Sequence, residues 1–254
     1  MTAPTPAPRA TVDDLAAEQR ALQTVVRALD PDGWLRPTPA RGWDVRDAIS
    51  HLADTDEMAI DTMLGGAGSL NAVGDRSASG ADTTYRGVLR GRRRPGAAVL
   101  EWYERTSARE REVIAGLDPD TRVPWGLGMK PPSFIAARLM ETWAHGLDVR
   151  AAIGIESVDS DRLAHVAWLA TRALPYAYAV AGSEPPAAPL RVELTLPSGA
   201  VFTYGPDDAA DRITGPAGEY CRVFVQRLRR ADATQLDATG DAAERALEVA
   251  RAYL

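Results

Sequence analysis

Apolar residues recur at helical spacing in four stretches of the first 154 residues. The first stretch follows Thr11, whose side chain suits a helix N-cap, and Asp13 and Asp14 occupy the next turn. In the last stretch, Pro132 suits the first turn of a helix. The pattern therefore predicts four helices, at 11–29, 44–64, 96–117 and 132–153.

The connection between the second and third predicted helices is unusually long for a helical bundle. Residues 65–96 are rich in glycine, serine and arginine. A connection of this length inside a bundle is usually a disordered insertion or a functional lid. We expect a lid or a crossover.

The pattern changes near Gly154. Residues 159–181 predict a long helix, which Pro175 is expected to kink or split. Period-two alternation at 190–196 and 201–204, on either side of a Pro-Ser-Gly turn, predicts a β-hairpin. A third strand and two closing helices are predicted at 212–214, 216–229 and 241–254.

These elements predict an α+β fold, in which an N-terminal four-helix up-down bundle is followed by a smaller α+β domain. The proline-rich start of the chain has no apolar run, so we expect a disordered tail rather than a signal peptide. The predicted divisions are a tail, a bundle and a C-terminal domain, at 1–9, 10–154 and 155–254.

Composition narrows the classes of function. The chain is 45% hydrophobic and 25% charged, and no apolar run is long enough for a membrane span. A net charge of −6 argues against a nucleic-acid partner. Cys221 is the single cysteine and cannot form an internal disulfide, so we expect the cytoplasm. The short arginine cluster at 90–94 indicates a solvated surface, or alternatively an anion contact near an active site.

The fourth predicted helix carries Glu141 and His145, which lie four residues apart and therefore share one face. Both faces of this helix are too apolar for open water, so the helix is expected to be buried all round. A buried carboxylate and imidazole need partners, and a metal ion would satisfy both.

His51 is the third candidate ligand, because it lies at the edge of the apolar stripe of the second predicted helix. Two histidines and one carboxylate leave coordination positions open, as in catalytic zinc or non-haem iron sites. An alternative remains open, in which these histidines are hydrogen-bonded core residues and not metal ligands. We assign His165, in the second half, to that alternative.

With these residues in hand, the sequence resembles the DinB-like superfamily and, within it, an actinobacterial metal-binding branch of the mycothiol-dependent maleylpyruvate isomerase family. Three blocks carry the resemblance, which covers nearly the whole chain: 42–47 (GWDVRD) leading to His51, 123–125 (VPW) and 137–149 (ARLMETWAHGLDV).

The resemblance implies a DinB-like four-helix bundle that binds one divalent metal, and a smaller α+β domain that covers the site. The metal ligands carry over onto His51, Glu141 and His145. Zinc is the expected metal, with Fe²⁺ and Ni²⁺ as alternatives. Asp148 matches an acidic position of the motif and is expected to orient His145 or a metal-bound water.

The resemblance also implies an isomerase or S-transferase that uses mycothiol as a thiol cosubstrate. A free thiol, with a pKa of about 8.5, is mostly protonated at neutral pH, and a metal ion deprotonates it. The thiolate would attack an electrophilic carbon of a small molecule. The reaction is an isomerisation if the thiolate leaves after a bond rotation, and a transfer if it stays.

Two other functions remain open from the sequence. A thiol-independent metalloenzyme would carry out hydrolysis, elimination, rearrangement or iron and oxygen chemistry, with Asp148 as a base. A non-catalytic protein would only bind a metal or a small ligand, with an apolar cavity and a closed site.

Further candidate contacts follow from the need to hold an acidic substrate or a thiol cosubstrate. They are one aromatic and four cationic side chains, Trp43, Arg86, Arg90, Arg222 and Arg227. The expected partner is a small molecule, and the chain is expected to be a monomer or a homodimer.

Overall fold

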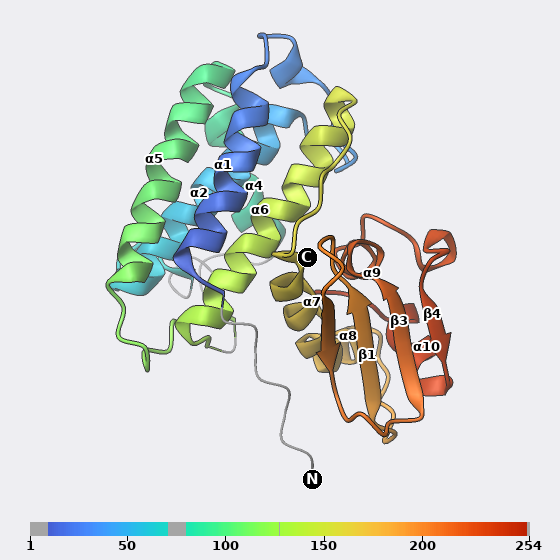
Figure 1. Ribbon diagram of the computed structural model, residues 1–254. Coiled ribbons are helices and arrows are strands. Elements are labelled where there is room, and N and C mark those ends of the chain that lie inside the picture. Colours follow the sequence, from blue (N-terminus) through green and yellow to red (C-terminus); the bar gives the residue numbers. More distant parts are fainter. Residues whose placement is uncertain (1–9, 71–79, 127, 253–254) are drawn as a thin grey trace. The chain divides into compact units, whose positions relative to one another are not determined.

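The computed structural model describes residues 10–70, 80–126 and 128–252, with the backbone alone at 80–84 (Figure 1). The predicted tail at 1–9 lies outside the described residues. The described chain divides into two compact units, 10–157 and 158–252. The predicted division at residue 154 stays a prediction, and the end of a long helix at Ile153 is consistent with it.

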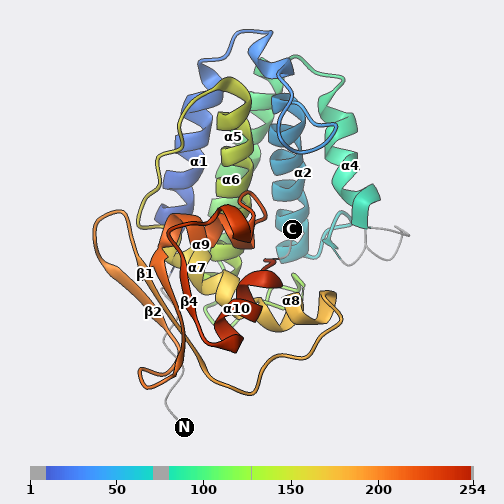
Figure 2. The ribbon, with the colours of Figure 1, turned by 90° about the vertical axis from the view of Figure 1, so that its right-hand side faces the viewer.

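The first unit contains the four predicted helices, which lie side by side in Figures 1 and 2. Two of them begin with capping boxes, in which Thr11 exchanges hydrogen bonds with Asp14, and Asp44 with Asp47. The prediction of an N-cap at Thr11 is therefore confirmed. The observed helices are α1 (Val12–Arg27), α2 (Val45–Leu64), α5 (Gly96–Ala115) and α6 (Pro131–Ile153).

Helix α6 is buried all round between Phe134 and Val149, apart from Glu141, which is partly exposed. This confirms the prediction from its two apolar faces. The helix begins with Pro131 in its first turn and is followed by Gly154, whose φ of +73° is the left-handed conformation that glycine adopts most readily.

The 65–96 connection contains a helix that the sequence analysis did not predict, α4 (Gly80–Gly91), which lies along α2 (Figure 2). Its glycines lower helix propensity but allow the two backbones to approach closely. A Cβ atom at Gly91 would lie 1.7 Å from Ser50 Oγ, and one at Gly87 would lie 2.7 Å from Asp54 Cβ. Residues 71–79 of this connection lie outside the described part.

The second unit is a four-stranded sheet with helices on one face (Figures 1 and 2). The strand order is β2-β1-β3-β4, with β1 and β2 forming the predicted hairpin and β3 lying parallel to β1. The last strand, β4, was not predicted. The strands are β1 (Leu190–Thr195), β2 (Val201–Tyr204), β3 (Asp211–Pro216) and β4 (Asp237–Thr239).

Three predicted helix boundaries in this unit were wrong. The predicted helix at 159–181 starts only at Leu163, and it splits near Pro175 as expected because proline lacks the amide hydrogen of a continuous helix. The two closing helices end earlier than predicted, at Phe224 and Glu248. The helices are α7 (Leu163–Arg172), α8 (Leu174–Val180), α9 (Ala217–Phe224) and α10 (Asp241–Glu248).

The fold class is α+β, as the sequence predicted. Two short 3₁₀ helices, η1 (Gly33–Leu35) and η2 (Arg230–Asp232), complete the described elements. Within the described residues, none of the helices is long and apolar enough to cross a membrane.

Candidate metal centre

Helices α2 and α6 bring His51, Glu141 and His145 together inside the bundle. Each offers one ligand atom, and the three atoms lie within 4.8 Å of one another. Glu141 and His145 reach the same point because they are one helical turn apart, and α2 supplies His51 from the neighbouring helix. In the described part of the chain, no other group of three such donors is this close.

One carboxylate oxygen of Glu141 lies near both imidazoles. Its Oε2 atom is 3.8 Å from His51 Nε2 and 3.7 Å from His145 Nε2. The two imidazole rings meet edge to face, with centroids 4.9 Å apart. Two ring nitrogens and one carboxylate oxygen form a donor set that suits zinc or iron and leaves further coordination positions open.

The surroundings hold two of these side chains in the protonation state that a metal ion requires. Burial lowers the pKa of His51, so its imidazole is neutral at pH 7. Burial alone would raise the pKa of Glu141, but the contact with His51 and the nearby charges of His145 and Arg138 outweigh it and lower this pKa to about 2. Metal ligands must be neutral imidazoles and ionised carboxylates, and these two residues meet that condition without a metal.

Asp148 lies behind His145, on the side away from Glu141. Its Oδ2 atom is 3.4 Å from Nδ1 of His145, while Nε2 of the same ring is the atom near Glu141. Asp148 is 2% exposed. A carboxylate at the far nitrogen favours a fixed ring orientation and tautomer.

Trp43 covers the two imidazoles from a loop before α2. Its indole lies stacked on His145, with ring centroids 5.8 Å apart, and is tilted against His51 at 5.2 Å. The loop is held by a bridge between Pro37 and Asp44, and the backbone amide and hydroxyl of Thr38 donate hydrogen bonds to the carbonyl of Trp43. Trp43 therefore forms a wall of the candidate centre.

The structure pairs the two candidate arginines of the first unit with acidic residues on α2. Arg86 and Arg90 both donate to Asp54, and Arg90 also donates to Glu57 at 2.6 Å. These pairs satisfy the buried carboxylate of Asp54, which a sequence cannot reveal because the partners are more than thirty positions apart. Ligand binding by Arg86 and Arg90 stays a prediction.

The other sequence candidates belong to the second unit. Arg222, on α9, forms an ion pair with Asp159 at 2.6 Å. Arg227 follows the end of α9 rather than lying on it, and it borders a cavity of about 420 Å³. His165 is buried on α7 and is not part of the cluster of three donors. The roles of Arg222 and Arg227 stay predictions.

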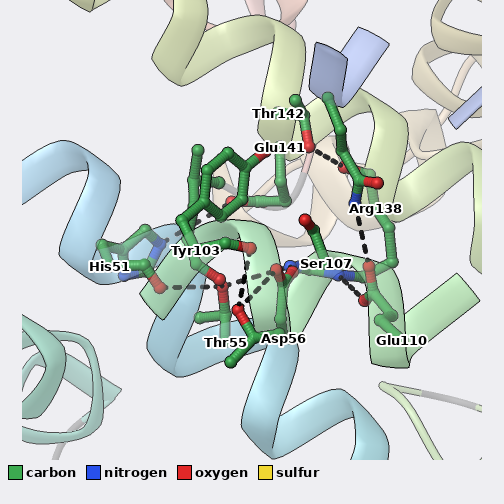
Figure 3. Close-up of polar contacts among 12 residues, drawn as sticks. His51, Thr55, Asp56, Tyr103, Ser107, Glu110, Arg138, Glu141 and Thr142 are labelled. Atoms are coloured by element: carbon green, nitrogen blue, oxygen red, sulfur yellow. Dashed lines mark hydrogen bonds and ion pairs between the residues drawn. The ribbon is translucent and has the colours of Figure 1, made fainter. Parts of the chain in front are cut away.

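Sequence analysis missed a polar cluster beside the centre, formed by the buried Asp56, Glu110 and Arg138 and the half-buried Thr55 (Figure 3). The sequence did carry a signal. Arg138 lies on a helix that was predicted to be buried all round, and a buried guanidinium requires acidic partners.

Comparison with known proteins agrees with the helical bundle. Residues 15–150 match the family model described as the mycothiol maleylpyruvate isomerase N-terminal domain. The chain belongs to this family. The resemblance that the three sequence blocks indicated is thus confirmed.

Two relatives match nearly the whole chain in sequence, and solved structures share its fold. Two uncharacterized proteins of Mycobacterium tuberculosis, from strains CDC 1551 / Oshkosh and H37Rv, are each 36% identical over 243 residues, which cover 95% of this chain and 94% of theirs. Crystal structures of the mycothiol-dependent maleylpyruvate isomerase and of a mutant of it share the fold, with a TM-score of 0.57 and 14% identity. The match covers 89% of this chain and 90% of those chains.

Proposed function

We propose that this protein is a metal-dependent enzyme that uses mycothiol, or a thiol like it, to act on a small electrophilic molecule. The observation that carries the proposal is the convergence of His51, Glu141 and His145 from two helices of a bundle of this family. Zinc is the proposed metal, with Fe²⁺ and Ni²⁺ as alternatives that the same donors accept.

The donor set fits a catalytic ion better than a structural one. Structural zinc sites are closed by four protein ligands, whereas catalytic sites use three and keep a position for substrate. The cluster here has three donors. When bound, a divalent ion would lower the pKa of a thiol beside it, so that the thiol is ionised at neutral pH.

The chain's own residues would prepare this position. Glu141 supplies the negative charge that partly balances a dication, and the imidazole of His51 is neutral before binding. Trp43 excludes water from one side of both imidazoles because its indole lies against their rings. A cosubstrate would therefore approach from a side that Trp43 does not cover.

The reaction proposed is addition of the thiolate to an electrophilic carbon. A new carbon–sulfur bond forms, and the electron pair of the attacked double bond moves to its electron-withdrawing group. If rotation follows and the carbon–sulfur bond breaks, the thiol is regenerated and the substrate is isomerised. If a proton is taken up instead, the thiol stays in the product and the reaction is a transfer. Isomerisation is the chemistry named for the solved relatives.

The position of Asp148 disfavours its role as the base of a thiol-independent enzyme. Its carboxylate lies at Nδ1 of His145, behind the ring, and is almost fully buried. A base would need to reach the substrate side of the centre. Asp148 is better placed to orient His145.

Calorimetric titration of the zinc-loaded protein with mycothiol tests the proposal. We expect saturable binding by the wild type and by His165→Ala, and no binding by His51→Ala, which lacks one ligand of the centre. S-methylated mycothiol serves as the matched ligand control, since its sulfur cannot ionise. Equal binding of mycothiol to the wild type and to His51→Ala, or equal binding of the methylated form, would contradict a thiol position at the metal.

A further inference from the structure

A single guanidinium connects three helices of the bundle next to the candidate metal centre. Arg138, on α6, donates from Nε to Glu110 Oε1 on α5 at 2.7 Å, and from Nη2 to Asp56 Oδ1 on α2 at 2.7 Å. Gln19, on α1, donates to the second oxygen of Glu110 at 3.2 Å. The exposed fractions of Arg138, Asp56 and Glu110 are 1%, 1% and 0%, so these bonds are made without water.

The same guanidinium reaches the backbone beside one metal ligand. Arg138 Nη2 also donates to Thr55 Oγ1 at 3.2 Å, and the Thr55 hydroxyl donates to the carbonyl oxygen of His51 at 2.9 Å. On its own helix, Arg138 lies one turn before Glu141 (Figure 3). One side chain therefore links the segment of α2 that carries His51 to the segment of α6 that carries Glu141.

This cluster is not explained by stability alone. Removing charges from water is costly, and replacing a buried ion pair with apolar side chains of similar volume often leaves stability unchanged or improved. Directional hydrogen bonds, unlike apolar contacts, fix the positions of the helices along one another. Ligands of a metal site must be held within about 0.5 Å of their working positions, so a fixed register matters most beside such a site.

The charges of the cluster are also arranged to balance. Arg138 faces two carboxyl groups, and burial together with the neighbouring Glu110 raises the pKa of Asp56 well above its usual range. Protonated Asp56 would leave one negative charge opposite one guanidinium. Thr106 donates to the other oxygen of Asp56 at 3.3 Å, which helps to fix the orientation of this carboxyl group.

We propose that Arg138 is a positioning residue, which sets the separation of His51 from Glu141 through Thr55, Asp56 and Glu110. The inference rests on the proposed metal centre, and it adds residues that position the ligands without binding the metal. Arg138 acts through the helices, so its loss should weaken metal binding even where the ligands and the fold remain.

The test uses a variant that removes the cluster without leaving unpaired charges. Arg138→Met alone would leave two buried carboxyl groups without their cation and is expected to fold poorly. The combined variant Asp56→Leu, Glu110→Met and Arg138→Met replaces all three ionisable groups with apolar side chains. Arg138→Lys is the second variant, because it keeps the charge balance but cannot reproduce the forked hydrogen bonds.

Zinc affinity is measured by competition with a chelator, and the visible spectrum of bound Co²⁺ reports ligand geometry. We expect both variants to keep the helical circular dichroism of the wild type and to shift the absorption bands of bound Co²⁺. We also expect them to bind zinc about 10- to 100-fold more weakly, because losing a group that orients metal ligands typically has an effect of this size. The matched control is Gln23→Met with Ser107→Ala. This pair forms a buried hydrogen bond of 3.0 Å between α1 and α5, and neither of these helices carries a ligand.

The outcomes separate this inference from the proposed function. If the wild type and the control bind zinc and either folded Arg138 variant binds it equally well, the positioning role is overturned and the metal centre stands. If the control weakens zinc binding as much as the Arg138 variants do, the effect is one of general stability and the inference also fails. If the wild type binds no zinc or Co²⁺, both the proposed centre and the inference fail.

Discussion

The indole of Trp43 lies parallel to the imidazole of His145, with 17° between the ring planes and 5.8 Å between the centroids. The same indole lies 5.2 Å from the ring of His51. One aromatic side chain therefore contacts both histidines of the candidate centre. A tryptophan in this position should report metal binding directly, since its emission depends on the groups that touch it.

We expect Co²⁺ to quench part of the tryptophan fluorescence, and Trp43 to account for that part. The chain has six tryptophans, so the assignment needs variants. Trp43→Phe should lose most of the Co²⁺-dependent change, whereas Trp125→Phe should keep it, because Trp125 contacts Phe134 rather than the histidines. A full Co²⁺ response in Trp43→Phe would show that the ion binds elsewhere.

Substitution of Gly91 by alanine should destabilise the bundle. The added Cβ atom would meet Ser50 Oγ at 1.7 Å, and Ser50 is fully buried against α4 with its hydroxyl donating to the carbonyl of Arg46. Overpacking of this kind costs about 1–3 kcal/mol in the free energy of unfolding. Urea unfolding followed by circular dichroism would measure it.

Gly116→Ala is the matched control for this substitution. Gly116 follows α5 with a right-handed backbone, and its added Cβ atom would meet no atom closer than the Val113 carbonyl oxygen at 3.6 Å, which is an ordinary contact. Its stability should be close to that of the wild type. A Gly91→Ala variant as stable as Gly116→Ala would contradict the close approach of α4 and α2.

Cys221 should be unreactive in the folded protein. Its side chain is fully buried on α9, its thiol lies 3.7 Å from the carbonyl oxygen of Leu163, and burial raises the pKa of the thiol well above its usual range. The thiol therefore stays protonated at pH 8, and only the thiolate is a strong nucleophile. A chromogenic disulfide reagent should titrate one thiol in denaturant and react slowly without it. Rapid stoichiometric reaction of the native protein would contradict this packing.

The sequence was sufficient for the elements whose signals are local. Thr11 indicates the start of α1 because its side chain caps the helix. The four-residue spacing of Glu141 and His145 places both on one face of α6. Helix α4 was missed because its glycines lower helix propensity. The structure shows that Gly91 lies too close to Ser50 to carry a larger side chain, and this contact cannot be inferred from the sequence.

The rest of the site depends on contacts between distant positions. Arg90 looks like a surface cation or an anion ligand in the sequence, but it pairs with Asp54 and Glu57 on another helix. Likewise, Arg138 on α6 pairs with Glu110 on α5, and no local signal in the sequence indicates this partner. Periodicity shows which residues are buried, and it does not show which buried charges are partners.

The central claim is that His51, Glu141 and His145 bind one metal ion. The most direct test is the metal content of protein purified without a histidine tag, measured by inductively coupled plasma mass spectrometry for the wild type and three histidine variants. We expect about one equivalent of a divalent metal, chiefly zinc, in the wild type and in His165→Ala, and none in His51→Ala or His145→Ala. Equal metal content in all four proteins, or a wild type that contains no metal after purification with added zinc, would contradict the claim.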